Sequence, residues 1–387
     1  MKIKIWKINK LEKICEILNN KRVPISQKDR ISGIYPYYGA SGIVDYIDKY
    51  IFDEELVLIG EDGAKWDAFE NSAFIASGKY WVNNHAHILK PNNEILINKF
   101  LVYFLNYSNL EKYITGATVK KLNQQKLKQI EIPLPPLKEQ ERIVGILDES
   151  FAKIDESIKI LEQNLLNLDE LMQSALQKAF NPLKDNAKEN YKLPQGWEWK
   201  SLGDISNYGK TSQVKPSQLK GNDWILELED IEKESGVLLQ KVLFQDRQSK
   251  SNKIKFNKGD ILFGTLRPYL KKVIIANDNG ACSSEIMPFS TGNSIANHFI
   301  YYYLFANFLH DRISSLTYGA RMPRLGTKDG KSLQIPLPPL KEQEQIAKHL
   351  DFVFEKTKAL KELYTKELKD YEELKQSLLN KAFKGEL

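Results

Sequence analysis

The chain has 387 residues, of which 42% are hydrophobic and 11% are aromatic. Such a composition can fill about two or three hydrophobic cores and excludes an intrinsically disordered chain. The formal net charge of +6 is compatible with a nucleic-acid partner but does not establish one. The longest apolar runs, at 100–107 and 299–309, are too short for a bilayer span, and the first ten residues lack a signal-peptide core. We therefore expect a cytoplasmic protein without a membrane partner.

Residues 1–131 form the first predicted globular segment. An apolar stretch at 99–107 predicts a helix, and the aromatic, glycine-containing stretch at 35–42 predicts turns. Short apolar runs bounded by Gly or Asn predict strands, which together with the helix make an irregular α+β domain. The predicted strands are 43–46, 56–59, 73–76 and 86–89.

Residues 132–182 form the first predicted long helix with its entry. The decamer at 132–141, Ile-Pro-Leu-Pro-Pro-Leu-Lys-Glu-Gln-Glu, places prolines and glutamates where a helix start favours them. Beyond it, apolar residues recur at alternating steps of three and four, which predicts a coiled-coil seam over 137–180, about 44 residues or about 66 Å. The helix therefore needs a partner helix. The seam residues expected to pair are Ile154, Ile158, Leu161, Leu165 and Leu168.

Residues 183–334 form a second globular segment, and residues 335–387 form a second helix with its entry. The decamer recurs letter for letter at 335–344, and the offset of 203 residues (132 to 335) holds to the Lys-Ala-Phe that closes each helix. An internal repeat of this kind predicts a duplicated half. The second seam is expected to use Leu360, Tyr364, Leu368, Tyr371 and Leu378.

The order of head, long helix, head and long helix, with Pro-Leu-Pro-Pro-Leu-Lys-Glu-Gln introducing each helix, resembles the specificity subunit of type I restriction-modification enzymes. The resemblance covers essentially the whole chain. Motifs that recur in that family are Tyr-Pro-Tyr-Tyr-Gly-Ala-Ser-Gly at 35–42, Gly-Glu-Asp-Gly-Ala at 60–64, Trp-Val-Asn-Asn-His-Ala-His at 81–87, Gly-Asp-Ile-Leu-Phe-Gly at 259–264, Leu-Arg-Pro-Tyr-Leu at 266–270 and Cys-Ser-Ser-Glu at 282–285.

This resemblance implies two target recognition domains, each reading one half of a split DNA sequence, and two long helices that pair antiparallel to set the spacer. The fold would be α+β with a pseudo-two-fold duplication. The chain would have no catalysis or cofactor of its own. It would bind double-stranded DNA and assemble two adenine methyltransferase subunits and then restriction subunits. Those partners would use S-adenosylmethionine, ATP and Mg. Two alternatives stay open: the recognition subunit of a related two-site type II restriction enzyme, and a coiled-coil scaffold without DNA binding.

Two loops at equivalent positions are candidates for contact with DNA. The loops 116–122 and 319–325 both begin with glycine and end with leucine, but their basic contents differ. Base edges and phosphates are contacted by such side chains, although basic loops are more often simply solvated. The candidates in these loops are Lys120, Lys121, Arg321 and Arg324.

Other candidates come from the family motifs. Arg267, followed by Pro268, suits a bidentate contact with guanine, with a structural arginine paired to a carboxylate as the alternative. Asn83, Asn84 and His85 beside Trp81 could read an adenine or stack on a base, with a hydrogen-bonded turn as the alternative. The remaining candidates, which carry hydroxyl or ammonium groups, are Tyr38, Lys65, Tyr269, Ser283 and Ser284.

Catalytic and metal-binding motifs are not evident in the sequence. His85 and His87 alternate on a predicted strand and would share a face, but without a third ligand we expect no metal site. The segment 62–65 reads as a turn rather than a nuclease element. The two cysteines, Cys15 and Cys282, are expected to be packing residues. The sequence lacks a nucleotide-binding glycine-rich loop and an amino-methyltransferase motif, so we assign no catalytic residue.

Overall fold

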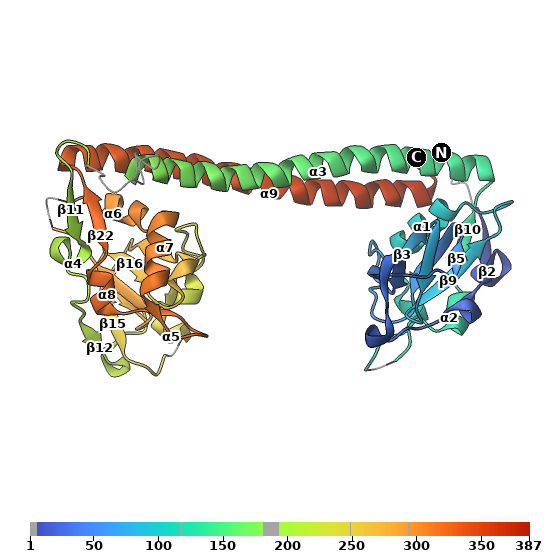
Figure 1. Cartoon of the computed structure of the whole chain (residues 1–387), viewed down its shortest axis with the longest axis horizontal. Coiled ribbons are helices and arrows are strands. Elements are labelled where there is room, and N and C mark those ends of the chain that lie inside the picture. The colour runs from blue at the N-terminus through green and yellow to red at the C-terminus, as the bar shows by residue number, and fades with distance from the viewer. Residues whose placement is uncertain (1–5, 117, 181–192, 248, 293–294) are drawn as a thin grey trace. The chain divides into compact units, whose positions relative to one another are not determined.

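The computed structural model describes residues 6–116, 118–180, 193–247, 249–292 and 295–387. The chain divides into two compact units, Met1–Glu162 with Thr365–Leu387, and Gln163–Tyr364. Each unit contains one head and a segment of both long helices (Figure 1). The predicted domain boundary at 182–183 and the polar linker after it lie outside the described residues.

Two four-stranded sheets form the first head, with strand orders β2-β9-β6-β7 and β4-β3-β8-β5. The first sheet is antiparallel around β6, whereas β3 and β8 pair in parallel in the second. The elements are β1 Lys7–Lys10, β2 Cys15–Ile17, β3 Ser32–Gly39, β4 Gly42–Ile47, β5 Phe52–Asp53, β6 Leu56–Gly60, β7 Ala73–Ala76, β8 Lys79–Val82, β9 Ala86–Pro91, β10 Glu131–Leu134, α1 Asn98–Tyr107 and α2 Gln124–Lys128.

The four predicted strands and the predicted helix of this head are confirmed as β4, β6, β7, β9 and α1. The prediction of turns over 35–42 is wrong, because most of that stretch belongs to β3 and only residues 40–41 form the turn into β4. Tyrosines favour the pleated, half-buried surface of a strand, and Tyr37 is 1% exposed, with its hydroxyl accepting from the Ile25 N–H at 2.9 Å and Arg30 lying over its ring. That packing outweighs the turn signal of the glycines.

The core of the first head includes both long helices. Phe100 and Leu105 on α1 are buried against the sheet that contains β6 and β7. The same cluster contains Leu147 from the first long helix and Leu379 from the second. The helix ends are thus part of the head's core rather than appendages to it. Each fully buried leucine contributes about 1.5–3 kcal/mol relative to an exposed one.

The second head repeats the strand pairing of the first. Strand β16 pairs antiparallel with β17 and β19, as β6 pairs with β7 and β9, and β13 pairs parallel with β18, as β3 pairs with β8. The sheets have the orders β12-β15-β18-β13-β14 and β17-β16-β19. The predicted duplication is therefore confirmed, and it includes the heads as well as the long helices.

The elements of the second head also include several short helices. They are β11 Glu198–Ser201, α4 Leu202–Ile205, β12 Gln213–Val214, β13 Trp224–Leu226, β14 Val242–Leu243, α5 Phe244–Arg247, β15 Lys253–Phe256, β16 Ile261–Gly264, β17 Val273–Ile275, β18 Gly280–Cys282, β19 Ile286–Phe289, α6 Asn297–Tyr303, α7 Asn307–Leu316, β20 Thr317–Tyr318, β21 Arg324–Leu325, α8 Thr327–Lys331 and β22 Gln334–Leu337.

The first half of the repeated decamer closes each head with a two-stranded sheet. Strand β10 pairs with β1, which places Pro133 opposite Ile8, and β22 pairs with β11, which places Pro336 opposite Trp199. Proline cannot donate to a strand ladder, so it is confined to edges of this kind. The chain then turns directly into a long helix.

The long helices are α3, Leu137–Phe180, and α9, Leu340–Lys384. The helix predicted over 137–180 is confirmed. In each unit a segment of α3 lies alongside a segment of α9, running in the opposite direction (Figure 1). Cross-helix ion pairs support the pairing: Lys375 Nζ lies 2.5 Å from Asp155 Oδ1 in the first unit, and Lys361 pairs with Asp169 in the second.

The decamer's glutamine locks each helix start to its head. Gln140 is fully buried, and its amide oxygen accepts a hydrogen bond of 2.9 Å from the Ile97 N–H. Its amide nitrogen donates to the carbonyls of Ile95 and Pro135, both at 2.8 Å. Gln343 makes the equivalent bonds to the Ala296 N–H at 3.1 Å and to the Pro338 carbonyl at 2.7 Å. The identity of the decamer thus reflects a structural joint.

The predicted seam residues differ in burial. Ile154, Leu161 and Leu168 are buried, and Leu360 is 38% exposed. Near Leu360, the buried position is Thr357, whose hydroxyl donates to the Val353 carbonyl at 2.8 Å. The half-buried members are Ile158, Leu165, Tyr364, Leu368, Tyr371 and Leu378.

Candidate nucleic-acid interface

Three segments meet at the end of β6 in the first head. The Glu61 N–H donates to the His85 carbonyl at 2.8 Å, and the Glu61 carbonyl accepts from the Leu122 N–H at 2.8 Å. Strand β6 is buried at every position, so it fixes Glu61 at the edge of the core. The loop after β6, the turn before β9 and the basic loop 116–122 are therefore joined by backbone hydrogen bonds.

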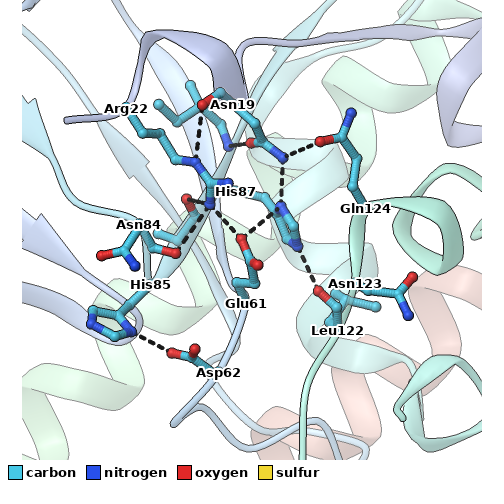
Figure 2. A network of polar contacts seen from close by, with 12 residues as sticks. Asn19, Arg22, Glu61, Asp62, Asn84, His85, His87, Leu122, Asn123 and Gln124 are labelled. Atoms are coloured by element: carbon cyan, nitrogen blue, oxygen red, sulfur yellow. Dashed lines mark hydrogen bonds and ion pairs between the residues drawn. The ribbon is translucent and has the colours of Figure 1, made fainter. Parts of the chain in front are cut away.

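The Glu61 carboxylate is the centre of a polar network (Figure 2). It is 9% exposed, accepts a short hydrogen bond from Arg22 and lies 2.9 Å from Lys121 Nζ. Burial by itself would raise the pKa of Glu61, but the hydrogen bonds from Arg22 and Lys121 outweigh it and lower that pKa below its ordinary value. Arg22 also donates to the carbonyls of Asn84 and Ala86.

His87 and His85 occupy different environments, so the expectation that both rings share one face of a strand is wrong. Strand β9 begins at Ala86, and His85 lies in the turn before it. The His87 ring is buried, with Nε2 2.6 Å from the Leu122 carbonyl and Nδ1 2.8 Å from the Asn19 amide nitrogen. Desolvation lowers the pKa of His87, which is therefore a neutral ring that donates through Nε2 and accepts at Nδ1.

His85 lies at the exposed side of the same network. Its Nδ1 is 2.5 Å from Asp62 Oδ1, and half of its side chain is open to solvent. Asn83 is buried and accepts from the His85 N–H at 2.7 Å, which is the hydrogen-bonded turn weighed as the alternative for this segment. Asn84 is exposed, and Trp81 donates from Nε1 to the Val23 carbonyl at 2.6 Å. His85 and Asn84 thus remain accessible to a ligand.

The predicted lysines of the first head are each paired with a carboxylate. Besides Lys121, the Nζ of Lys120 lies 2.8 Å from Glu111 and that of Lys65 lies 3.4 Å from Glu70. Tyr38 packs against Tyr80, with ring centroids 5.5 Å apart, and burial raises the pKa of its hydroxyl. Lys65, Lys120 and Lys121 would have to exchange their carboxylate partners for a phosphate in order to contact the DNA backbone.

The second head reproduces the backbone joints of the first. The Thr265 N–H donates to the Glu285 carbonyl at 2.8 Å, and the Thr265 carbonyl accepts from the Leu325 N–H at 2.9 Å. Thr265 is therefore the equivalent of Glu61, and Arg324 is the equivalent of Lys121. Arg324 lies 3.4 Å from the Glu285 carboxylate. Each head thus holds the basic residue that precedes the closing leucine of its loop against an acidic neighbour.

The other candidates of the second head lie around this joint. The Arg267 N–H donates to the Pro323 carbonyl at 2.7 Å, so the structure brings the Arg267 turn and the basic loop 319–325 together. Tyr269 is 48% exposed, and Ser283 is buried with a hydroxyl that has no hydrogen-bond partner among the described residues. Ser284 and Arg321 are exposed.

Sequence reasoning missed the residues that organise the first site. Arg22 lies 39 residues from Glu61 in the chain, and nothing local marks it as the partner of that carboxylate. Glu61 lies in the Gly-Glu-Asp-Gly-Ala motif at 60–64, but nothing in the sequence indicates that its carboxylate is buried.

Helix α2 adds a further residue to this network. The Asn123 side chain caps α2 by accepting from the Lys126 N–H at 2.9 Å, and the next residue, Gln124, accepts from the Asn19 amide at 3.0 Å.

Among the residues that the structure describes, no group of three or more His, Cys, Asp or Glu side chains is placed to hold a metal ion. Cys15 and Cys282 are free and buried, as expected of packing residues, and burial raises the pKa of the Cys15 thiol to about 12. Within the described part of the chain, every helix falls short of the length and apolar content needed to cross a membrane.

Solved structures share this fold. A chain from a structure on complex assembly and conformational transition of the type I R-M system superposes with a TM-score of 0.71 at 19% identity, covering 99% of both chains. The HsdS subunit from Thermoanaerobacter tengcongensis superposes with a TM-score of 0.56 at 19% identity, covering 99% of this chain and 98% of that one.

Sequence comparison identifies the family. A specificity subunit assigned to a type I restriction enzyme of Haemophilus influenzae is 31% identical over 352 residues, 89% of this chain and 86% of that protein. The EcoDI specificity subunit of Escherichia coli is 25% identical over 408 residues, 99% of this chain and 88% of that protein. The model of the type I restriction modification DNA specificity domain matches residues 3–166 and 194–370. The chain therefore belongs to the type I restriction-modification DNA specificity family and carries its domain twice.

Proposed function

We propose that this chain is the DNA-recognition subunit of a type I restriction-modification complex, with each head reading one half of a split target. Most of the binding free energy would come from contacts with phosphates and would depend on salt, whereas a few side chains per head would select the bases.

The observation that supports this proposal most strongly is the contrast between fixed and variable parts of the two heads. Gly116 and Gly319 start the equivalent loops with φ of +94° and +93°, and Leu122 and Leu325 end them in the core. The side chains between these ends differ, whereas the glutamines that lock each head to its helix are identical. A constant frame with variable contents suits two readers of different base sequences.

The long helices would fix the spacer between the half-sites and dock two methyltransferase subunits, which would then recruit restriction subunits. Their nearly equal lengths of 44 and 45 residues support a shared spacing role. Large apolar side chains also stay exposed on both helices, and such side chains favour a protein partner. They include Ile160, Leu166, Leu171, Phe352, Leu363 and Leu374.

Catalysis would belong to the partner subunits. The Glu61 network is built of ion pairs and backbone hydrogen bonds, and its neutral His87 is buried away from solvent, so it positions loops rather than transferring protons. S-adenosylmethionine, ATP and Mg would be used by the methyltransferase and restriction subunits. The chain would act in the cytoplasm, where the DNA and these cofactors are.

The test is to exchange residues 1–131 for the first head of another family member and to sequence methylated DNA from cells that also express the cognate methyltransferase. The proposal expects one half of the split motif to change while the other half and the spacer stay constant. A change in both halves would count against separate reading by the two heads.

The spacer role has its own test. Inserting one or two helical turns into α3, or matched turns into both α3 and α9, should change the number of unspecified base pairs between the half-sites without changing the half-sites. An unchanged spacer in a folded variant would show that the helices do not set it.

A further inference from the structure

Arg267 occupies, in the second head, the position that Gly63 occupies in the first. Each lies two residues after the equivalent residues Thr265 and Glu61, which make the same backbone hydrogen bonds. The backbone is left-handed at both places, with φ of 48° at Arg267 and +71° at Gly63. The fold therefore requires a left-handed residue at this point, and only the first head supplies a glycine.

This conformation is unfavourable for arginine. A residue with a Cβ atom is strained in the left-handed region, whereas glycine is not. The Arg267 N–H donates to the Pro323 carbonyl at 2.7 Å, and the left-handed backbone recurs at the equivalent Gly63, so the fold imposes the conformation. Strained residues of this kind cluster at functional sites. What arginine adds at this position is its side chain.

The Arg267 side chain is free to bind a ligand. It is exposed and lines an open pocket of about 570 Å³ on the second head. Two other cationic side chains line the pocket, and both are occupied: Arg247 lies 2.7 Å from Asp230, and Lys272 donates to the Leu228 carbonyl at 2.7 Å. Among the described residues, Arg267 is the one cation of this pocket whose head group has no partner.

The charges around the pocket balance, which leaves the Arg267 guanidinium as the free group for a ligand. Three carboxylates, those of Glu227, Glu229 and Glu285, line it together with the three cations. Glu227 and Glu285 are themselves paired, with Lys253 at 2.7 Å and with Arg324 at 3.4 Å, so their charges are already compensated. A base edge is uncharged and presents acceptors and donors side by side. Arginine pairs bidentately with the O6 and N7 acceptors of guanine in the major groove.

We propose that Arg267 is a specificity-determining residue of the second head and reads a guanine in the second half of the DNA target. This rests on the proposed function of the chain as a DNA reader. The guanidinium donates to guanine O6 and N7 from the exposed position of Arg267 between β16 and β17. The equivalent turn of the first head, with glycine, makes no such contact.

The experiment compares the parent with Arg267→Gly and Arg267→Lys, each assembled with the cognate methyltransferase, by methylome sequencing and by titration of duplexes that differ at single positions. Arg267→Gly is expected to accept all four bases at one guanine position of the second half-target. Its affinity for the parental sequence should fall about tenfold or more. Arg267→Lys should keep a weakened preference for guanine, because lysine binds as a point charge without the planar fork.

A matched control is Glu234→Gly, which replaces another exposed left-handed residue of the same head, with φ of 61°. It should leave the methylated motif unchanged. The thermal midpoint of Arg267→Gly should equal or exceed that of the parent, because glycine removes the strain, so unfolding cannot mimic the expected result.

Three results would overturn the inference. Full retention of the parental motif by Arg267→Gly would show that this residue reads no base. A uniform loss of affinity for every duplex, with the motif unchanged, would identify a phosphate contact instead. A second half-target without a guanine would exclude the assignment outright. A parent that directs no methylation motif would be a different failure, because it would contradict the proposed function itself.

Discussion

Phe180 at the end of α3 and Phe383 at the end of α9 occupy equivalent positions in the repeat, and each packs against a helix of a head. Phe383 meets Phe100 of α1 edge to face with ring centroids 5.4 Å apart, and Phe180 meets Phe299 of α6 in the same way at 5.0 Å. The Lys-Ala-Phe that closes both repeats is thus a docking contact. Each helix starts from one head and ends on the core of the other.

Replacing Phe180 with alanine should therefore destabilise the second unit. Phe180 is 2% exposed, and truncating a buried phenylalanine costs about 3–5 kcal/mol of unfolding free energy. Urea denaturation followed by tryptophan fluorescence would measure the loss. Leu166→Ala on the same helix is the control, because Leu166 is 59% exposed and its truncation should change stability by less than about 0.5 kcal/mol. Equal losses in both variants would contradict the docking role.

Gln140→Ala should loosen the joint between the first head and α3. The substitution leaves the Ile97 N–H and the Pro135 carbonyl buried without their partner, which costs about 1–3 kcal/mol for a buried polar group. Hydrogen exchange should show faster exchange of the Ile97 amide, while amides of the second head keep their rates. Gln163→Ala, at an exposed position of α3, should leave exchange in the head unchanged. If the Ile97 amide exchanged at the parental rate in both variants, Gln140 would not be what holds the head to α3.

The ion pairs of Glu61 should make stability depend on pH in the acidic range. Its folded-state pKa lies below the ordinary value of 4.5, so the stabilisation is fully present above that value and is lost as the pH falls through the folded-state pKa. Glu61→Gln removes the charge at every pH. The difference in unfolding free energy between parent and Glu61→Gln should be constant near neutral pH and should shrink below about pH 4.5. A difference that does not vary with pH would mean that the carboxylate is not stabilised by these pairs.

Gly63→Ala should destabilise the first head by about 1–2 kcal/mol, the cost of a left-handed conformation for a residue with a Cβ atom. A Cβ at Gly63 would meet nothing within 4 Å, so the loss would come from the backbone alone. The same substitution at Gly145, inside α3, also meets nothing within 4 Å and should stabilise the protein by about 0.5–1 kcal/mol. Thermal unfolding of both variants checks the opposite signs, and a shared sign would contradict the argument.

The long-range plan could be predicted from the sequence because a repeated motif fixes equivalence without any knowledge of contacts. The decamer located both helix starts, and the three-and-four spacing located α3. In α9 the predicted positions Tyr364, Leu368, Tyr371 and Leu378 are half-buried, whereas Leu360 is 38% exposed. A helix of 3.6 residues per turn drifts relative to a 3.5-residue seam, so one position of the pattern can leave the buried face while its neighbours stay on it.

The candidate site was less predictable because its bonds join distant segments. Arg22, Glu61 and Lys121 come from three parts of the first head, and no local pattern links them. Arg267 and Gly63 are equivalent because Thr265 and Glu61, two residues before them, make the same backbone hydrogen bonds. The stretch 35–42 shows a further limit, since burial of Tyr37 turned an apparent turn into a strand.

The most direct test of the account is single-molecule methylome sequencing of DNA from cells that express this chain with its cognate methyltransferase, compared with cells that express the methyltransferase alone. The account predicts a new split motif, methylated on adenine in both halves, that appears only when this chain is present. Assembly of the complex, verified by copurification, without any new motif would contradict the claim that the two heads read DNA.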